Sequence, residues 1–185
     1  MQDQNHGAGW QTGGRVEIDP LIAALNSENG GERQQARQAL IDLGRPAVPA
    51  LIEMLEKSPV QHARWEAAKA LGEIADPRAA PVLARTLEDR EFDLRWLAAK
   101  GLIAIGPMAL PPLLLALEHK ANLVVLREGA HHVLSSLAKQ GYEAQAMPVI
   151  RALDGIEPTA HVPRVARDVL DEMSRTHRQR FWYEP

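Results

Sequence analysis

The chain contains no cysteine, which excludes disulfide bonds, thiol nucleophiles and zinc sites built on cysteine. A chain without cysteine fits a reducing compartment, so we expect a cytoplasmic location. Aromatic residues make up only 4% of the 185 residues, whereas hydrophobic residues make up 45%. The core must therefore be built from alanine, leucine, isoleucine and valine, which suit closely packed helices.

The chain also lacks an excess of positive charge, because 21 lysines and arginines stand against 24 aspartates and glutamates, a formal net charge of −3. General nucleic-acid binders are more often basic, so we expect no nucleic-acid partner. We expect no membrane association, because no apolar run is expected to approach the ~18 residues of a membrane helix. The N-terminal segment Met1–Gly14 is polar and glycine-rich, unlike a signal peptide. No convincing strand is predicted, and no glycine-rich phosphate loop, catalytic serine or cofactor site is recognisable.

One sequence motif occurs twice with small changes: residues 64–71 read RWEAAKAL and residues 95–102 read RWLAAKGL. The displacement is about 31 residues, and a fixed period of this size is typical of stacked repeat proteins. Four arginines mark the repeat at nearly constant spacing, and each has an alanine at the third position after it: Arg33, Arg64, Arg95 and Arg127.

Each unit predicts a short helix that begins near proline, then a turn and a second helix that carries the arginine. Such a pair cannot bury enough apolar surface alone, so neighbouring pairs must stack. We expect about five helix pairs within residues 17–175, the fifth irregular. Residues 1–16 are predicted to be a disordered tail, and residues 176–185 an aromatic C-terminal tail.

The pattern of residues 64–74, with prolines and leucines before it, resembles the HEAT-like repeats of the phycocyanobilin-lyase type. The resemblance implies an all-α, right-handed superhelix, related to armadillo-like α-solenoids. The proline-bearing helices would form its convex face and the arginine-bearing helices its concave groove. The compact, alanine-rich repeats also suggest a bacterial protein.

In such repeats the groove is lined by the two residues after the arginine, the residue after the alanine pair, and the residue before the closing isoleucine. Carried onto this chain, the resemblance implies four sets of groove residues. These are Gln34, Gln35, Gln38 and Asp42; Trp65, Glu66, Lys69 and Glu73; Trp96, Leu97, Lys100 and Ala104; and Glu128, Gly129, His132 and Ser136.

Trp65 and Trp96 occupy the same position in adjacent repeats, so their rings are expected to lie side by side. Two interpretations stay open: each ring packs against the neighbouring repeat, or the rings and Leu97 form an aromatic binding patch. Lys69, Glu73 and Lys100 would set the orientation of a partner. Glu66 would pair with Lys69 or Lys100.

Glu128, His131 and His132 share a helix face at metal-like spacing. A di-iron bundle needs a second such motif and two further carboxylates, which the chain lacks, so we expect no metal site. His131 is expected to fill a core position or to bond a neighbouring turn. Each repeat arginine is expected to bond the turn before it and the turn of its neighbouring repeat, but a turn aspartate for such a bond is recognisable only at Asp89.

The C-terminal tail contains Phe181, Trp182 and Tyr183, with Arg178 and Arg180 just before them. It would fold back to cap the last repeat, or dock onto a second copy to form a weak homodimer, or remain disordered. Otherwise the protein is expected to be monomeric.

The leading hypothesis is a non-enzymatic scaffold that binds a peptide or helix of another protein in its groove. Two alternatives come from the resemblance. One is a bilin lyase or bilin chaperone, in which the tryptophans stack on the tetrapyrrole. The other is a HEAT-like DNA-repair glycosylase, which the absence of a basic rim disfavours.

Overall fold

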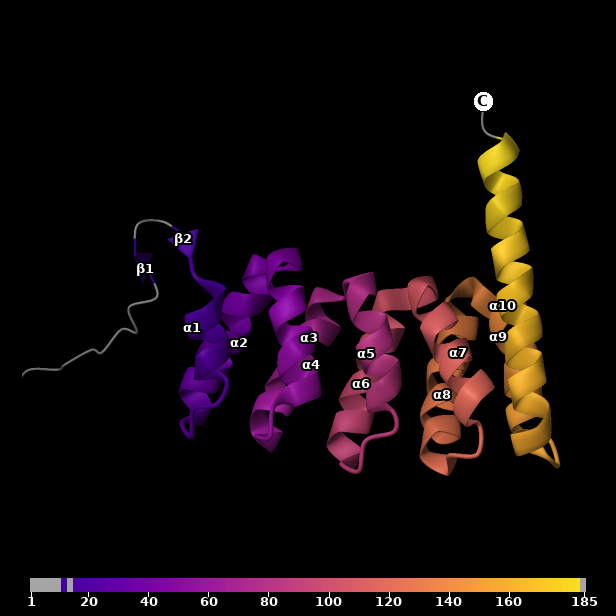
Figure 1. The fold of residues 1–185 in the computed structure, drawn as a ribbon, viewed down its shortest axis with the longest axis horizontal. Helices are drawn as coiled ribbons and strands as arrows, with labels where there is room; N and C mark the ends of the chain where they lie inside the picture. The colour runs from indigo at the N-terminus through magenta and orange to yellow at the C-terminus, as the bar shows by residue number, and fades with distance from the viewer. Residues whose placement is uncertain (1–10, 13–14, 184–185) are drawn as a thin grey trace, which may run out of the picture.

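The computed structural model describes the backbone of residues 11–12 and 15–183 and the side chains of residues 17–176. Over this range the chain forms helical hairpins stacked side by side in one row (Figure 1). The fold is an all-α solenoid, as the repeated pattern predicts. Its α-helices are α1 (Ile18–Ala24), α2 (Gly30–Leu43), α3 (Val48–Lys57), α4 (Gln61–Ile74), α5 (Ala80–Thr86), α6 (Phe92–Ile105), α7 (Leu110–Lys120), α8 (Val124–Leu137), α9 (Glu143–Leu153) and α10 (Pro158–Tyr183).

The first four hairpins form two layers. The first helices, α1, α3, α5 and α7, pack on one another in sequence, and so do the second helices, α2, α4, α6 and α8. The second helices contact one another more extensively than the first helices do, which is the packing expected on the inner side of a curved stack. We call the exposed surface of α2, α4, α6 and α8 the second-helix face.

Each second helix of the first three hairpins ends at a residue with positive φ, followed by a 3₁₀ turn that contains proline. The terminal residues are Gly44 (φ 66°), Ala75 (φ 53°) and Gly106 (φ 76°). Glycine tolerates this conformation, and proline cannot continue a helix, so the sequence itself stops the helix here. The 3₁₀ turns are η1 (Arg45–Ala47), η2 (Pro77–Ala79) and η3 (Gly106–Ala109).

Asp76 caps η2 and binds two arginines from successive turns. Its Oδ1 accepts hydrogen bonds from the backbone N–H and the Nε of Arg78, each at 2.9 Å, and its Oδ2 accepts one from Nε of Arg45 at 3.1 Å. The Arg78 side chain and backbone N–H, with Arg45, hold the pKa of Asp76 well below its usual range. Because Arg45 and Asp76 lie one period apart, this cluster ties adjacent repeats together.

The repeat arginines bind the carbonyl groups of the turn or helix end before them, as the sequence predicts. Arg33 donates to the Ser27 carbonyl (2.8 Å), and Arg95 donates to the Asp89 carbonyl (2.9 Å). Arg127 likewise donates to the Ala121 carbonyl (2.5 Å). These bonds satisfy backbone acceptors that the helices leave unpaired.

Arg64 also reaches the next repeat. It donates to the Leu55 carbonyl (3.1 Å) and forms an ion pair with Asp89. Burial of the Asp89 carboxyl opposes its ionisation, but the backbone N–H of Glu91 and the Arg64 guanidinium outweigh burial, so the pKa of Asp89 lies below its ordinary value. Arg64 therefore has the inter-repeat partner that the sequence indicated at Asp89.

The fifth hairpin reverses the order of the layers. Here α9 packs against α8, in the layer of second helices, whereas α10 packs against α7, in the layer of first helices. The cause lies in the connection η4 (Ala138–Tyr142), a π-turn in which Gly141 has φ 101° and which leads straight from α8 into α9. The irregular last pair predicted from the sequence is thus an inverted pair.

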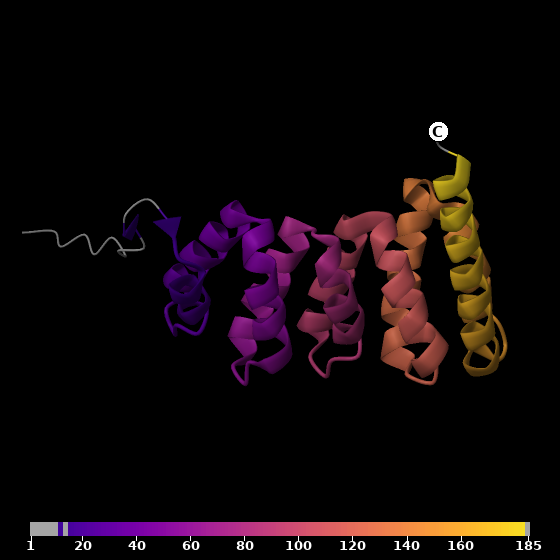
Figure 2. The same cartoon turned by 45° about the horizontal axis from the view of Figure 1, so that its top comes forward.

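The chain from 176 onward continues α10, whose helix extends to Tyr183. In Figures 1 and 2 its last turns project beyond the other helices. The predicted boundary at residue 175 therefore falls inside a helix, and the backbone does not fold back as a separate cap. The reason is local: residues 170–182 contain no proline or glycine that would end the helix.

At the other end, Gln11–Thr12 (β1) and Arg15–Val16 (β2) pair as two-residue antiparallel strands that the sequence did not predict. The rest of the predicted N-terminal tail, residues 1–10 and 13–14, lies outside the described residues. The segment Phe92–Lys120 is long and apolar enough to cross a membrane, contrary to expectation. Here it comprises α6, η3 and α7, and half of its most apolar window is buried in the core.

Candidate interaction surface

Helices α4 and α6 approach closely where two glycines face each other. A Cβ atom on Gly72 would lie 3.3 Å from Cα of Gly101, and one on Gly101 would lie 2.8 Å from Cδ1 of Leu83. Larger residues would therefore separate the two helices. Beside this crossing the second-helix face has a shallow depression of about 150 Å³, lined by Ala68, Lys69, Gly72, Glu73, Leu97, Lys100, Gly101 and Ala104.

Five of the predicted groove residues line this depression: Lys69 and Glu73 from α4, and Leu97, Lys100 and Ala104 from α6. Lys100 and Glu73 are exposed, and Leu97 is half-buried against the core. The depression thus has an apolar floor of Ala68, Leu97 and glycine backbone with charged groups of both signs around it. We call this set of residues the α4–α6 depression.

Trp65 lies beside the depression and is half-buried, packed against the core. The Lys69 ammonium lies over its ring, with Nζ 4.5 Å from the ring centroid. A cation over an aromatic face is attracted by the ring's quadrupole. Trp65 therefore packs mainly as a structural residue against the core. Its ring also positions Lys69, a charged residue of the depression.

Trp96 differs from Trp65 because it is 48% exposed. Its ring stacks on His132 of the next repeat, with centroids 5.2 Å apart and an interplanar angle of 25°. The stacking partner of Trp96 is thus a histidine on α8, whereas Trp65 carries Lys69 over its ring. Trp96 and His132 form an exposed aromatic step from α6 to α8.

Glu66 does not lie in the predicted groove, because it is only 4% exposed. Its carboxylate pairs with Arg37, and Nε of Arg33 lies 3.7 Å away, so neither Lys69 nor Lys100 is its partner. The second position after the repeat arginine faces the preceding repeat: here Glu66 faces α2, and Gly129 lies against Leu87. Sequence reasoning missed Arg37, which takes the place of an alanine in the next two repeats.

The remaining predicted residues lie elsewhere on the second-helix face. Gln35 and Gln38 are exposed on α2, where Gln38 donates a 2.9 Å hydrogen bond to Asp42. Glu128 lines a separate hollow of about 410 Å³ on α8, together with His131. The structure therefore divides the predicted groove into a polar surface on α2 and a mixed surface from α4 to α8.

His131 bonds a neighbouring turn, one of the two roles predicted for it. Its Nε2 lies 3.1 Å from Oδ1 of Asp154, at the end of α9, and its Nδ1 lies 3.4 Å from the Ser135 hydroxyl. Among the residues that the structure describes, no group of three metal-ligating side chains is found.

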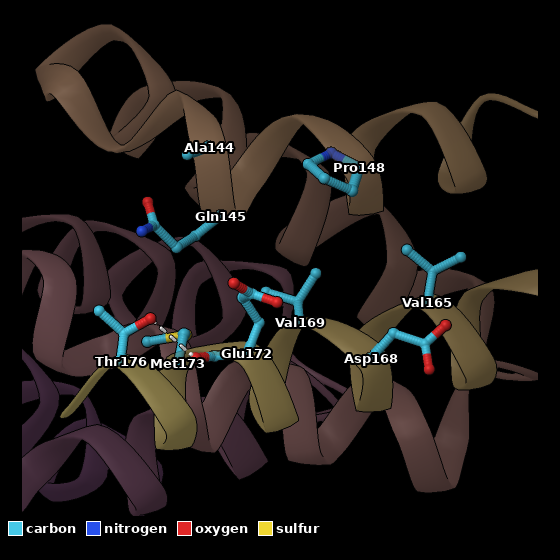
Figure 3. Close-up of a pocket in the computed structure, with 9 residues that line it drawn as sticks. All are labelled: Ala144, Gln145, Pro148, Val165, Asp168, Val169, Glu172, Met173 and Thr176. Atoms are coloured by element: carbon cyan, nitrogen blue, oxygen red, sulfur yellow. Dashed lines mark hydrogen bonds between the residues drawn. The ribbon is translucent and has the colours of Figure 1, made fainter. Parts of the chain in front are cut away.

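A further hollow of about 600 Å³ lies at the open end of the stack, between α9 and α10 (Figure 3). Sequence reasoning missed it. The helical spacing of Val165, Val169 and Met173 indicates an apolar side of this helix, but it does not show that a hollow lies beside it.

The geometry defines an α-solenoid of stacked helical hairpins with one layer of closely packed second helices. Residues 18–103 match the family model for HEAT repeats, so this part of the chain consists of HEAT-like repeats, and the solenoid of helical hairpins continues beyond it through α7 and α8. The match is to HEAT repeats in general, and the phycocyanobilin-lyase type is not confirmed. No curated protein matches the chain. HEAT repeats commonly mediate protein–protein interactions.

Proposed function

We propose that the protein is a non-enzymatic, cytoplasmic scaffold that binds a peptide or helix of a partner protein on the second-helix face. The binding surface runs from the α4–α6 depression to the Trp96–His132 step. The observation that carries the proposal is the exposure of Trp96, a large aromatic ring held in one orientation by His132. Tryptophan is enriched among residues that dominate binding energy.

The surface is also preorganised, which favours binding. Lys69 is held over Trp65, and the glycine crossing fixes α4 against α6. A rigid surface loses little conformational entropy when a partner binds. The depression accepts a small apolar side chain against Leu97, while Lys69, Lys100 and Glu73 offer charges to a polar segment on either side.

Site-specific photo-crosslinking in native cells tests the proposal. A benzoylphenylalanine at position 96 should give discrete crosslinked protein adducts, and a Lys100→Glu change should weaken them. The matched control is position 115, because Leu115 is 50% exposed on α7, in the other layer. No adduct at position 96, or the same adducts at positions 96 and 115, would show that the second-helix face is not the binding surface.

A further inference from the structure

The open end of the stack carries an apolar groove that nothing in the described chain fills. Ala144 and Pro148 of α9 and Val165, Val169 and Met173 of α10 line it, with Gln145 and Thr176. Two carboxylates, Asp168 and Glu172, stand at its edge (Figure 3). The groove is thus apolar along its floor and acidic along one rim.

The two rim carboxylates are weakly neutralised within their own helix. Nε of Arg164 lies 3.9 Å from Asp168, and Nη2 of Arg175 lies 3.7 Å from Glu172. The Asp168 and Glu172 side chains are 68% and 74% exposed, respectively. Such exposed pairs contribute little to stability, so both carboxylates can accept a further cationic partner.

Charge is segregated along α10. The helix carries Asp168, Asp171 and Glu172 in one block, and the sequence then places Arg175, Arg178 and Arg180 in the next. Arg167, on another side of α10, is bound to Glu118 of α7. Asp168 and Glu172 therefore share an open side of α10 with the groove, whereas Arg167 anchors another side of the helix to α7.

A helix with an acidic block followed by a basic block is complementary to a copy of itself running in the opposite direction. We propose that α10 pairs antiparallel with α10 of a second copy, in a twofold-symmetric dimer. The dyad near Ser174 brings position 168 of one copy opposite position 180 of the other. The projecting last turns of each α10 then lie along the apolar groove of the partner copy (Figure 1).

A symmetric arrangement uses each contact twice, which is why cyclic dimers of this kind are common. The partly exposed Pro148, Val165 and Met173 supply apolar surface for the interface, and the charge blocks fix the antiparallel direction. The interface lies at the end of the stack and leaves the second-helix face free. The proposal is therefore independent of the partner binding proposed for that face.

Sedimentation velocity of the full chain over a concentration series tests the dimer. The wild type should show a monomer–dimer equilibrium that weakens at high salt. Asp168→Arg/Glu172→Arg makes the acidic block mainly basic, since only Asp171 stays acidic there, and Arg178→Glu/Arg180→Glu makes the basic block mainly acidic, since only Arg175 stays basic there. Each variant alone should dimerise at least about tenfold more weakly, which corresponds to a loss of about 1.4 kcal/mol.

Mixing the two variants is the decisive measurement. Their charge blocks are complementary in both halves of the antiparallel pair, so the mixture should form a heterodimer that neither variant forms alone. The control is Glu28→Arg/Glu53→Arg, which makes the same charge change on exposed residues of the first two repeats and should dimerise like the wild type.

Three results would overturn the proposal. The wild type could remain monomeric at all concentrations, which would leave the groove to a different, basic partner. The dimer could survive both charge-reversal variants, which would locate the interface elsewhere. The mixture could fail to associate while circular dichroism shows both variants folded. Arg178 and Arg180 lie beyond the hairpin that α9 and α10 form, so their variant tests the idea without disturbing the repeats.

Discussion

Gly72 and Gly101 face each other across α4 and α6, and each occupies a place where a Cβ atom would meet the neighbouring helix. An added Cβ at Gly101 would lie 3.2 Å from Cα of Gly72 and 2.8 Å from Cδ1 of Leu83. This crossing sets the spacing of the two central repeats, and it also shapes the floor of the α4–α6 depression.

Gly101→Ala is expected to lower the free energy of unfolding by about 0.5–2 kcal/mol. Overpacking costs about 1–3 kcal/mol, and the better helix propensity of alanine offsets up to about 1 kcal/mol of it. Urea unfolding measures the change. Gly30→Ala is the control, because its added Cβ would meet nothing nearer than Nη2 of Arg33 at 3.5 Å. An unchanged stability of Gly101→Ala would show that the helices are not held this close.

Glu66→Gln should destabilise the first two repeats by about 3 kcal/mol, because it leaves the half-buried Arg37 without its counter-charge. A double variant, Arg37→Met/Glu66→Leu, removes both charges and should return the stability to within about 1 kcal/mol of the wild type. Urea unfolding of Arg37→Met, Glu66→Leu and the double variant gives the coupling energy. Additive losses in the double variant would contradict the pairing.

Arg64→Ala should cost more stability than Arg127→Ala. Both changes lose a hydrogen bond to a backbone carbonyl, but only Arg64 also holds Asp89 in the next repeat. A hydrogen bond to a charged group contributes about 1.5–3 kcal/mol, so a difference of about 2 kcal/mol is expected. Thermal unfolding of the two variants checks it, and Asp89→Asn should remove most of the difference.

The lowered pKa of Asp76 predicts that the stability of the protein decreases as the pH falls into the acid range. Its pKa is lower in the folded protein than its ordinary value of 3.8, so its contribution to stability is present above that value and is lost as the pH falls through the folded pKa. Asp76→Asn keeps the cap acceptor but loses the charge that binds Arg78 and Arg45. The stability difference between wild type and Asp76→Asn should be constant from pH 7 to about pH 5 and shrink below about pH 4. A difference independent of pH down to pH 2 would contradict the assignment.

The sequence by itself determined the repeat, the hairpin order and the helix ends. The constant period, the leucines at helical spacing, and stop signals such as Gly44 and Gly106 act through local backbone preferences, so no distant contact is needed to read them. The arginine bonds to the preceding turns were readable for the same reason, since their partners lie within one unit.

Only the tertiary structure decided which residue faces which neighbour. Glu66 faces α2 and not the predicted groove, because Arg37, almost a full repeat earlier in the sequence, lies opposite it. Trp96 stacks on His132 of the next repeat, a partner that the sequence did not predict, for the same kind of reason. The inverted last hairpin followed from one connection at Gly141, whose effect on α9 and α10 depends on how whole helices pack on α7 and α8. Such contacts join residues far apart in the chain, and a helical period records which side of a helix is apolar but not what lies against it.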